Sequence, residues 1–317
     1  MPLAAQSATS TSPSEEPTPT EGPDIPRGAL GHVRAVAGAL LTPTGLVGAA
    51  LEASWLGFHL GLYPLGLVGA RASHRRAGYR VDHLSPVQRG LSVCDLDAAQ
   101  TPILLIHGLV DNRSIFTVLR RRLVSRGFGR IESINYPLST QDVRTAAAQL
   151  AAEVERLVEE TGHERIHIIG HSLGGLIARY YVTRLGGDLR VHTLVTLGTP
   201  HGGSYLAYAW NSPLTRQLRP GSKLLAELAQ PVRECQTRFI SYWSDLDQVV
   251  LPQRNAALRH PDLNVHNIGL HGVGHGSLPF TRSVVHGISR ALAHLDSSGA
   301  TVTPGVSEVT RRRVRPL

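Results

Sequence analysis

The sequence of 317 residues is poor in cysteine, lysine and aromatic residues. Its two cysteines, Cys94 and Cys235, exclude a disulfide-dense secreted miniprotein and a four-cysteine zinc site. They form either one disulfide or two separate thiols, because separation along the chain does not give their distance. No pattern recurs every 20–50 residues, which excludes solenoids and propellers. The 42% of apolar residues is enough to bury a large core in one α/β domain with attached tails.

Nearly all of the positive charge comes from arginine. Lysine occurs once, at Lys223, and 32 basic minus 24 acidic residues give a formal charge of +8. Arginines cluster at Arg120-Arg121-Arg122 and in the tail Arg311-Arg312-Arg313-Val314-Arg315, without an aromatic pattern or a nucleic-acid-binding motif beside them. We therefore expect no nucleic-acid partner. The first interpretation of the arginines is a solvated surface, and the second is attraction to anionic lipid headgroups.

The composition divides the chain into four regions. Residues 1–28 are rich in Pro, Ser and Thr and are predicted to be a disordered tail, as are the polar and then basic residues 298–317. The beginning lacks a basic segment followed by a short apolar run, so we expect no conventional cleavable signal peptide. Residues 29–76 are predicted to form an apolar helical segment, and residues 77–297 to form the main folded domain.

The apolar region 29–76 leaves its relation to a membrane open. Between Ala35 and Ala70 the strongly ionisable residues are Glu52 and His59. Each large apolar side chain favours insertion by about 0.3–0.6 kcal/mol, whereas a central acid costs roughly 2.5–3.5 kcal/mol and the prolines and glycines cost more. The sum is near zero, so the segment either spans a membrane, lies on its surface or packs on the folded domain. The protein is accordingly expected to be membrane-associated or cytoplasmic.

From about Thr101 onward, strand and helix signals alternate, which predicts an α/β domain with a mainly parallel sheet. The region Ser204–Pro231 is longer than an ordinary crossover and rich in Tyr and Leu, and we expect it to form a small cap or lid. Strands are predicted over Ile103–Ile106, Arg130–Asn135, Ile166–Ile169, Val191–Leu197, Phe239–Trp243 and Val265–Ile268. Helices are predicted over Ile115–Ser125, from Val143 to a stop at Gly162, over Leu173–Leu185 and over Ser283–Leu295.

The strongest chemical signal is Gly170-His171-Ser172-Leu173-Gly174, which fits G-x-S-x-G. An apolar strand precedes the motif and a helix begins directly after the serine. Such a turn lifts the hydroxyl above the sheet, and the helix start aims N–H groups and a positive dipole at an oxyanion. The alternative is a glycine-rich turn whose serine has no chemical role. It explains less well why a strand precedes the motif and a helix follows it. Ser172 is the predicted nucleophile and the N–H of Leu173 a predicted oxyanion donor.

A serine nucleophile needs a general base, and the base needs an orienting acid. With this type of motif the acid and then the histidine follow the serine in the chain. Asp245 and Asp247 both follow a predicted strand and are the candidates for the acid. For the base, the candidates are His275, in a glycine-rich loop, and its neighbour His271.

A second oxyanion donor is expected from the loop after the first strand, which runs from Ile106 to Asn112. Gly108 lets the backbone approach the reacting carbonyl, so the N–H of Leu109 is the expected partner of the Leu173 N–H. One such donor contributes about 2.7–4 kcal/mol in the transition state.

The segment His163-Glu164-Arg165-Ile166-His167 matches the zinc-protease pattern H-E-x-x-H. That chemistry needs both histidines on one helix face. Here Gly162 ends a helix and His167 falls in a predicted strand, so the context is wrong. The sixteen histidines are dispersed along the chain. We therefore expect no metal and no cofactor.

Together these motifs resemble those of the bacterial triacylglycerol lipases and esterases of the α/β-hydrolase superfamily. The resemblance covers about Thr101 to Leu295 and implies an α/β-hydrolase catalytic domain over 77–297 with a small cap at 204–231. It favours Asp247 over Asp245 as the acid and His275 over His271 as the base. The other matching motifs are His107-Gly108, Leu197-Gly198-Thr199-Pro200-His201-Gly202-Gly203, Asp247-Gln248-Val249-Val250 and Gly274-His275-Gly276.

The resemblance implies a serine carboxylic-ester hydrolase, a triacylglycerol lipase or esterase, acting on lipid or other ester substrates. Ser172, Asp247 and His275 would form its catalytic triad, and the reaction would pass through an acyl-enzyme. Acyltransferases, thioesterases and lipid deacylases use the same triad with another acceptor or leaving group, and these alternatives stay open. A non-catalytic binding module attached to a membrane is the alternative from a different class. The complete set of candidate catalytic residues argues against it.

Overall fold

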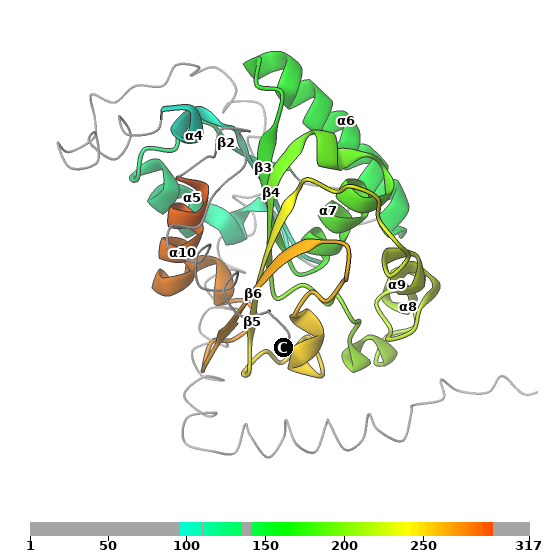
Figure 1. Cartoon of the computed structure of the whole chain (residues 1–317). Coiled ribbons are helices and arrows are strands. Elements are labelled where there is room, and N and C mark those ends of the chain that lie inside the picture. Colours follow the sequence, from blue (N-terminus) through cyan, green and yellow to red (C-terminus); the bar gives the residue numbers. More distant parts are fainter. Residues whose placement is uncertain (1–95, 110, 135–140, 294–317) are drawn as a thin grey trace, which may run out of the picture.

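The computed structural model describes residues 96–109, 111–134 and 141–293, in which six parallel strands form one sheet with helices on both faces (Figure 1). The order of strands in the sheet is β2-β1-β3-β4-β5-β6, and every neighbouring pair is parallel. The predicted fold class, α/β with a mainly parallel sheet, is confirmed. The strands are β1 (Ile103–Ile106), β2 (Ile131–Ile134), β3 (Ile166–His171), β4 (Val191–Leu197), β5 (Arg238–Ser244) and β6 (Asn264–Leu270).

Four α-helices, α5, α6, α7 and α10, correspond to the predicted ones, whereas α4, α8 and α9 were not predicted. α10 ends at Leu292, before the predicted end, and the start of α5 also differs. There the first turn is a 3-10 helix, η1 (Arg113–Phe116), which begins at the cap residue Asn112. α6 begins where the Asp142 carboxylate accepts two backbone N–H groups, and it ends at the predicted stop, Gly162, whose φ is 73°. The α-helices are α4 (Leu96–Gln100), α5 (Thr117–Val124), α6 (Val143–Thr161), α7 (Leu173–Arg184), α8 (Pro213–Gln217), α9 (Lys223–Leu228) and α10 (Arg282–Leu292). Further 3-10 helices are η2 (Gly187–Leu189), η3 (Tyr205–Tyr208), η4 (Gln253–Ala256) and η5 (Leu278–Phe280).

The strands have a hydrophobic core on each side of the sheet. Along β1, Leu104 and Ile106 pack with the apolar side chains of α6 and α7, whereas Ile103 and Leu105 pack with those of α5 and α10. This alternation follows from the two-residue period of a strand, and burial on both faces explains why β1 is wholly apolar. The leucines of α8 and α9 join the core on the α6 and α7 side.

The parallel arrangement brings five loops to one edge of the sheet. β1, β3, β4, β5 and β6 all end at this edge, because parallel strands share one direction. The predicted oxyanion loop, the serine turn, the acid candidates and the histidine candidates therefore follow strands that lie side by side. Ligands of open α/β sheets bind at this carboxyl edge.

Several predictions fall on residues outside the described ranges: the two tails, the apolar region 29–76 and Cys94. Within the described ranges, no helix combines the length and the hydropathy that crossing a bilayer requires.

Candidate active site

Ser172 occupies a sharp turn between β3 and α7. Its φ of 52° and ψ of −121° lie in a region that residues other than glycine rarely adopt. The Ser172 N–H donates to the carbonyl of Leu197 at the end of β4, at 2.8 Å, and the Ser172 carbonyl accepts from the N–H of Gly175 at 3.1 Å. These bonds fix the serine at the carboxyl edge of the sheet, where it is 9% exposed.

Asp247 and His275 form a buried pair. His275 Nδ1 lies 2.8 Å from Asp247 Oδ2, and Asp247 is fully buried. The other carboxylate oxygen, Oδ1, accepts the N–H groups of Val249 and Val250, each at 2.8 Å. Because Nδ1 faces a carboxylate, that nitrogen carries the ring proton, and Nε2 of a neutral ring is left with a lone pair that can accept one.

The two rival candidates, Asp245 and His271, also pair with each other. His271 Nδ1 lies 2.7 Å from Asp245 Oδ2, but the two side chains are 93% and 50% exposed. Burial would raise the pKa of Asp245, but the Gly272 N–H and the His271 ring outweigh it and lower this pKa below its usual value. Of the two acid and two histidine candidates, Asp247 and His275 therefore form the buried pair, and Asp245 and His271 form the exposed pair.

The end of β4 joins the serine turn to the buried pair. Leu197 accepts the Ser172 N–H, and the next residue, Gly198, packs directly on the pair. A Cβ added at Gly198, whose φ is 56°, would lie 2.9 Å from His275 Nδ1 and 3.1 Å from Asp247 Oδ2. Ser172, Asp247 and His275 lie far apart in the sequence. They meet around Leu197, the last residue of β4, and Gly198, which follows it.

The predicted oxyanion loop runs beside Ser172. A Cβ added at Gly108 would lie 3.0 Å from the Cβ of Ser172, so the backbone approaches the serine closely there. Leu109 follows in the chain and is partly buried against the core. Leu173 is the first residue of α7, and the first N–H groups of an α-helix have no acceptor within the helix. Of the two predicted donors, Leu173 follows Ser172 in the chain, and Leu109 follows the glycine that contacts Ser172.

His171 contacts the base loop and the oxyanion loop, a role that the sequence analysis did not assign. Its Nε2 lies 3.2 Å from the carbonyl oxygen of His275, and the two rings are 4.8 Å apart between centroids. Its Nδ1 lies 3.3 Å from Asp111 Oδ2 in the oxyanion loop. The signal in the sequence is a polar residue at the last position of an apolar strand, directly before the nucleophile.

Comparisons with known proteins agree with this geometry. Residues 102–258 match the family model of palmitoyl protein thioesterase. Over 117 residues the chain is 32% identical to a triacylglycerol lipase of Pseudarthrobacter phenanthrenivorans, covering 35% of this chain and 36% of that protein. A triacylglycerol lipase of Burkholderia plantarii is 32% identical over 117 residues, 35% of this chain and 32% of the relative. The match thus spans about a third of the length of these curated relatives.

Solved structures share the architecture. Lipase B of Aspergillus fumigatus superposes with a TM-score of 0.60 at 15% identity, covering 90% of this chain and 79% of that one. In sequence and in fold, the chain is similar to lipases and esterases of the α/β-hydrolase superfamily. The Bacillus licheniformis lipase BlEst2 in its propeptide form has a TM-score of 0.53 at 19% identity, covering 71% of this chain and 54% of that one. The predicted family and the predicted α/β-hydrolase fold are confirmed.

The Thr-Pro-His-Gly-Gly segment, residues 199–203, follows β4 at the candidate site. His201 is buried, and its Nε2 lies 3.0 Å from Thr196 Oγ1. Burial, and secondarily the charge of Arg179, hold the pKa of His201 well below its usual value, so the ring stays neutral. Asn255 donates its amide N–H groups to the carbonyls of Gly202 and Gly203. These contacts hold the segment against β4 and η4.

The segment 204–231 contains η3, α8 and α9 and is attached to the loop of the acid. Ser204 Oγ donates to the carbonyl of Val249 at 2.6 Å and accepts the N–H of Leu251 at 3.0 Å. Through Ser204 the start of this segment is held next to the residues that bind Asp247.

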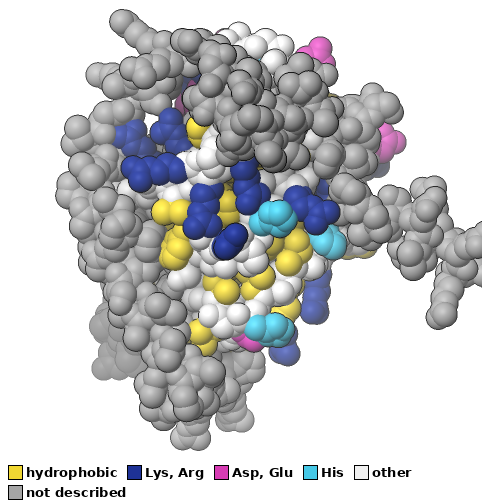
Figure 2. Space-filling model, turned by 90° about the vertical axis from the view of Figure 1, so that its left-hand side faces the viewer, with side chains coloured by type: hydrophobic (Ala, Val, Ile, Leu, Met, Phe, Trp, Pro, Cys, Tyr) yellow, Lys and Arg dark blue, Asp and Glu magenta, His cyan; other side chains and the backbone are white. Residues whose placement is uncertain are grey.

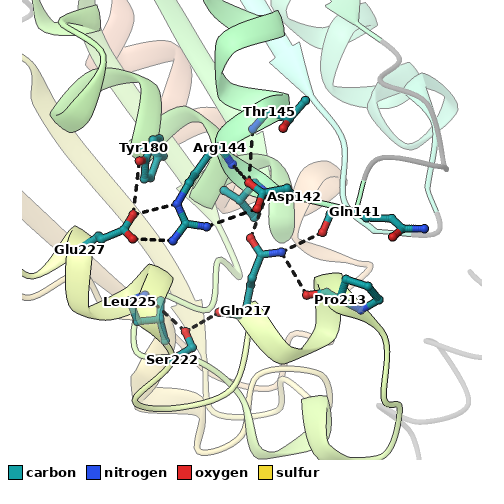
Figure 3. Close-up of polar contacts among 11 residues, drawn as sticks. Gln141, Asp142, Arg144, Thr145, Tyr180, Pro213, Gln217, Ser222, Leu225 and Glu227 are labelled. Atoms are coloured by element: carbon teal, nitrogen blue, oxygen red, sulfur yellow. Dashed lines mark hydrogen bonds and ion pairs between the residues drawn. The ribbon is translucent and has the colours of Figure 1, made fainter.

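Polar contacts also fix α8 and α9 to the beginning of α6 (Figure 3). The guanidinium of Arg144 binds both oxygens of Glu227, at 2.9 and 2.5 Å, and the Tyr180 hydroxyl donates to the same carboxylate at 3.3 Å. The Gln217 amide donates to the carbonyl of Gln141 and accepts the N–H of Val143. The segment predicted to be a cap or lid is thus bound to the core by several directional contacts.

The described part of the chain shows no metal centre. There, no three His, Cys, Asp or Glu side chains are arranged to hold an ion. In the H-E-x-x-H segment, His163 lies in the loop after α6 and His167 in β3, so the two histidines do not share a helix face.

Proposed function

We propose that this hydrolase is a serine carboxylic-ester hydrolase of the lipase type, which cleaves acyl esters of lipids through an acyl-enzyme. The observation that carries the proposal is the buried Asp247–His275 pair, which packs against the same strand end as Ser172. The similarity to triacylglycerol lipases supports the class of substrate.

In the first half of the reaction, Ser172 Oγ attacks the ester carbonyl carbon while its proton passes to His275 Nε2. Asp247 Oδ2 accepts the hydrogen bond from Nδ1 and stabilises the imidazolium that forms. The carbonyl oxygen becomes an oxyanion, to which the N–H groups of Leu109 and Leu173 donate.

The tetrahedral intermediate then collapses. The bond between the carbonyl carbon and the alcohol oxygen breaks, His275 gives its proton to that oxygen, and the acyl group stays on Ser172. A water molecule repeats the sequence: it loses a proton to His275, attacks the acyl carbon and releases the carboxylic acid, and the proton returns to Ser172 Oγ.

Thioester cleavage is the second candidate, because residues 102–258 match the palmitoyl protein thioesterase family model. The steps are the same except that a thiol leaves in place of an alcohol. The two candidates therefore differ in which leaving group the enzyme prefers, and both require Ser172.

The test is the hydrolysis of p-nitrophenyl esters from acetate to palmitate, of triglyceride and of palmitoyl-coenzyme A by the purified full chain. Ser172→Ala should lower kcat by at least about 10⁴-fold, whereas the control Ser283→Ala, an exposed serine on α10, should retain full activity. Hydrolysis by Ser172→Ala at the original rate contradicts the proposal. A higher kcat/KM for the thioester than for the matched palmitate ester replaces the first candidate with the second.

A further inference from the structure

The face formed by α5 and α10 is strongly basic (Figure 2). α5 buries Leu119 and Leu123, and α10 buries Val284, Val285, Ile288, Ser289 and Leu292, whereas the basic residues of both helices point outward. We call these outward residues and the neighbouring loop position the basic face. It consists of Arg120, Arg121, Arg122, Arg126, Arg282, His286 and Arg290.

The two segments that form this face contain no acidic residue. The sequence contains no Asp or Glu from Asn112 to Ile131, or from Leu263 to Leu295. Among the described residues, no carboxylate pairs with Arg121, Arg122, Arg126, Arg282 or Arg290. The arginines on and near α6 differ from those of the basic face, because each of them binds at least one glutamate. They are Arg130, Arg144, Arg156 and Arg190.

Like charges are crowded where the two helices meet. Arg126 Nη1 lies 3.3 Å from His286 Nδ1 on α10. Burial, followed by the charges of Arg122 and Arg282, lowers the pKa of Arg126. Guanidinium groups from both helices therefore repel one another, and an external anion would relieve this repulsion.

The basic face begins at the candidate active site. α5 follows the oxyanion loop through η1, and α10 follows His275 through η5. Both helices follow loops at the carboxyl edge of the sheet, so the basic face starts next to the edge that holds Ser172.

We propose that the basic face binds the anionic headgroup surface of a lipid bilayer. Guanidinium groups bind phosphate oxygens in pairs, and each basic residue near an anionic membrane surface contributes about 1 kcal/mol. The arginines are spread over two helices rather than gathered into a pocket, which suits an extended surface, and Val124, 38% exposed, lies among them. α5 and α10 carry no Phe, Tyr or Trp on which the bases of a nucleic acid would stack.

The experiment measures sedimentation with sucrose-loaded vesicles at near-physiological salt. The full chain is used with Ser172→Ala, so that no lipid is hydrolysed and the result does not depend on the proposed chemistry. Vesicles of phosphatidylcholine alone are compared with vesicles that also contain phosphatidylglycerol, and the readout is the ratio of the two partition coefficients.

The test variant is Arg121→Glu/Arg122→Glu/Arg282→Glu. The matched control, Lys223→Glu/Arg233→Glu/Arg259→Glu, changes the net charge equally at exposed positions outside the basic face. The test variant should lower the ratio at least about tenfold, and the control less than about twofold. If the test variant does not fold, judged by circular dichroism, the triple alanine variant replaces it.

Equal ratios for the test and control variants would overturn the proposal, as would a ratio near one for the parent protein. Duplex DNA serves as the competitor. If it binds the parent more tightly than the anionic vesicles do and loses affinity in the test variant, the face is a nucleic-acid site and not a membrane site.

Discussion

His275 Nδ1 lies 2.8 Å from Oδ2 of Asp247, and both side chains are buried at the end of β4. The exposed pair beside it, Asp245 and His271, has almost the same length, 2.7 Å. Distance therefore does not distinguish the two pairs; burial and contact with the serine turn do. An exposed ion pair contributes about 0–1 kcal/mol, whereas a buried acid that orients a general base affects the rate directly.

Exchanging each acid for its amide separates the two pairs. Asp247→Asn should lower kcat by about 10⁴-fold, because the amide presents an N–H to His275 and favours the wrong ring tautomer. Asp245→Asn should change kcat less than about fivefold, because its partner is exposed. Steady-state kinetics on a p-nitrophenyl ester measures both. The assignment of the acid is wrong if Asp245→Asn is the more damaging change.

The contact between Gly198 and the buried pair predicts a position-specific loss of activity. Gly198→Ala should lower kcat at least about 100-fold, because the new Cβ displaces the His275 ring. Gly186→Ala is the control: its φ of 74° imposes similar backbone strain, but a Cβ there meets nothing within 4 Å. Kinetics and thermal unfolding are measured on both variants. Equal losses of activity would show that backbone strain, and not contact with the pair, is responsible.

His171 is expected to position the base rather than to react. His171→Phe keeps a ring but removes the contact with the His275 carbonyl, so kcat should fall about five- to tenfold with little change in KM. His171→Gln, whose amide can donate to the same carbonyl, should recover part of kcat. A rise in KM at constant kcat would show instead that His171 acts on substrate binding.

The buried His167 predicts a pH-dependent stability. Burial, and secondarily the charges of His192 and Arg165, lower the pKa of His167 from its usual 6.5 to about 3. Below about pH 6.5 the unfolded chain therefore binds one more proton at this position, and stability falls as the pH drops from about 6.5 toward 3. The slope is on the order of 1.4 kcal/mol per pH unit.

His167→Leu should remove this contribution and flatten the pH dependence of the free energy of unfolding, measured by urea denaturation. His266→Leu, at an exposed position in β6, is the control and should leave the slope unchanged. An unchanged slope in His167→Leu would mean that the ring is not held neutral by folding.

Local patterns in the sequence were sufficient to predict the framework. β1 and β4 have the predicted bounds. β1 is a run of four apolar residues, and β4 is a buried segment of seven residues rich in Val, Leu and Thr. α6 ends at Gly162 as predicted, because a left-handed residue ends a helix and glycine adopts that conformation readily. The serine turn could also be predicted, because the five residues of its motif, Gly170–Gly174, are consecutive in the sequence.

Contacts between distant loops were not predictable from these patterns. Asp245 and Asp247 are two residues apart in one loop, so only the direction of each side chain and its burial distinguish them. The contact of His171 with His275 and the gathering of arginines from α5 and α10 on one face depend on which elements become neighbours. The periodicity of apolar residues within one segment does not show which other segments pack beside it.

The most direct test of the central claim is labelling with a fluorophosphonate, followed by peptide mapping in a mass spectrometer. This reagent phosphonylates a serine that an adjacent base activates. We predict one adduct, on Ser172, which forms rapidly in the parent protein and at least about 100-fold more slowly in His275→Ala. An adduct on another serine, or labelling of Ser172 at an unchanged rate without His275, would contradict the proposed catalytic triad.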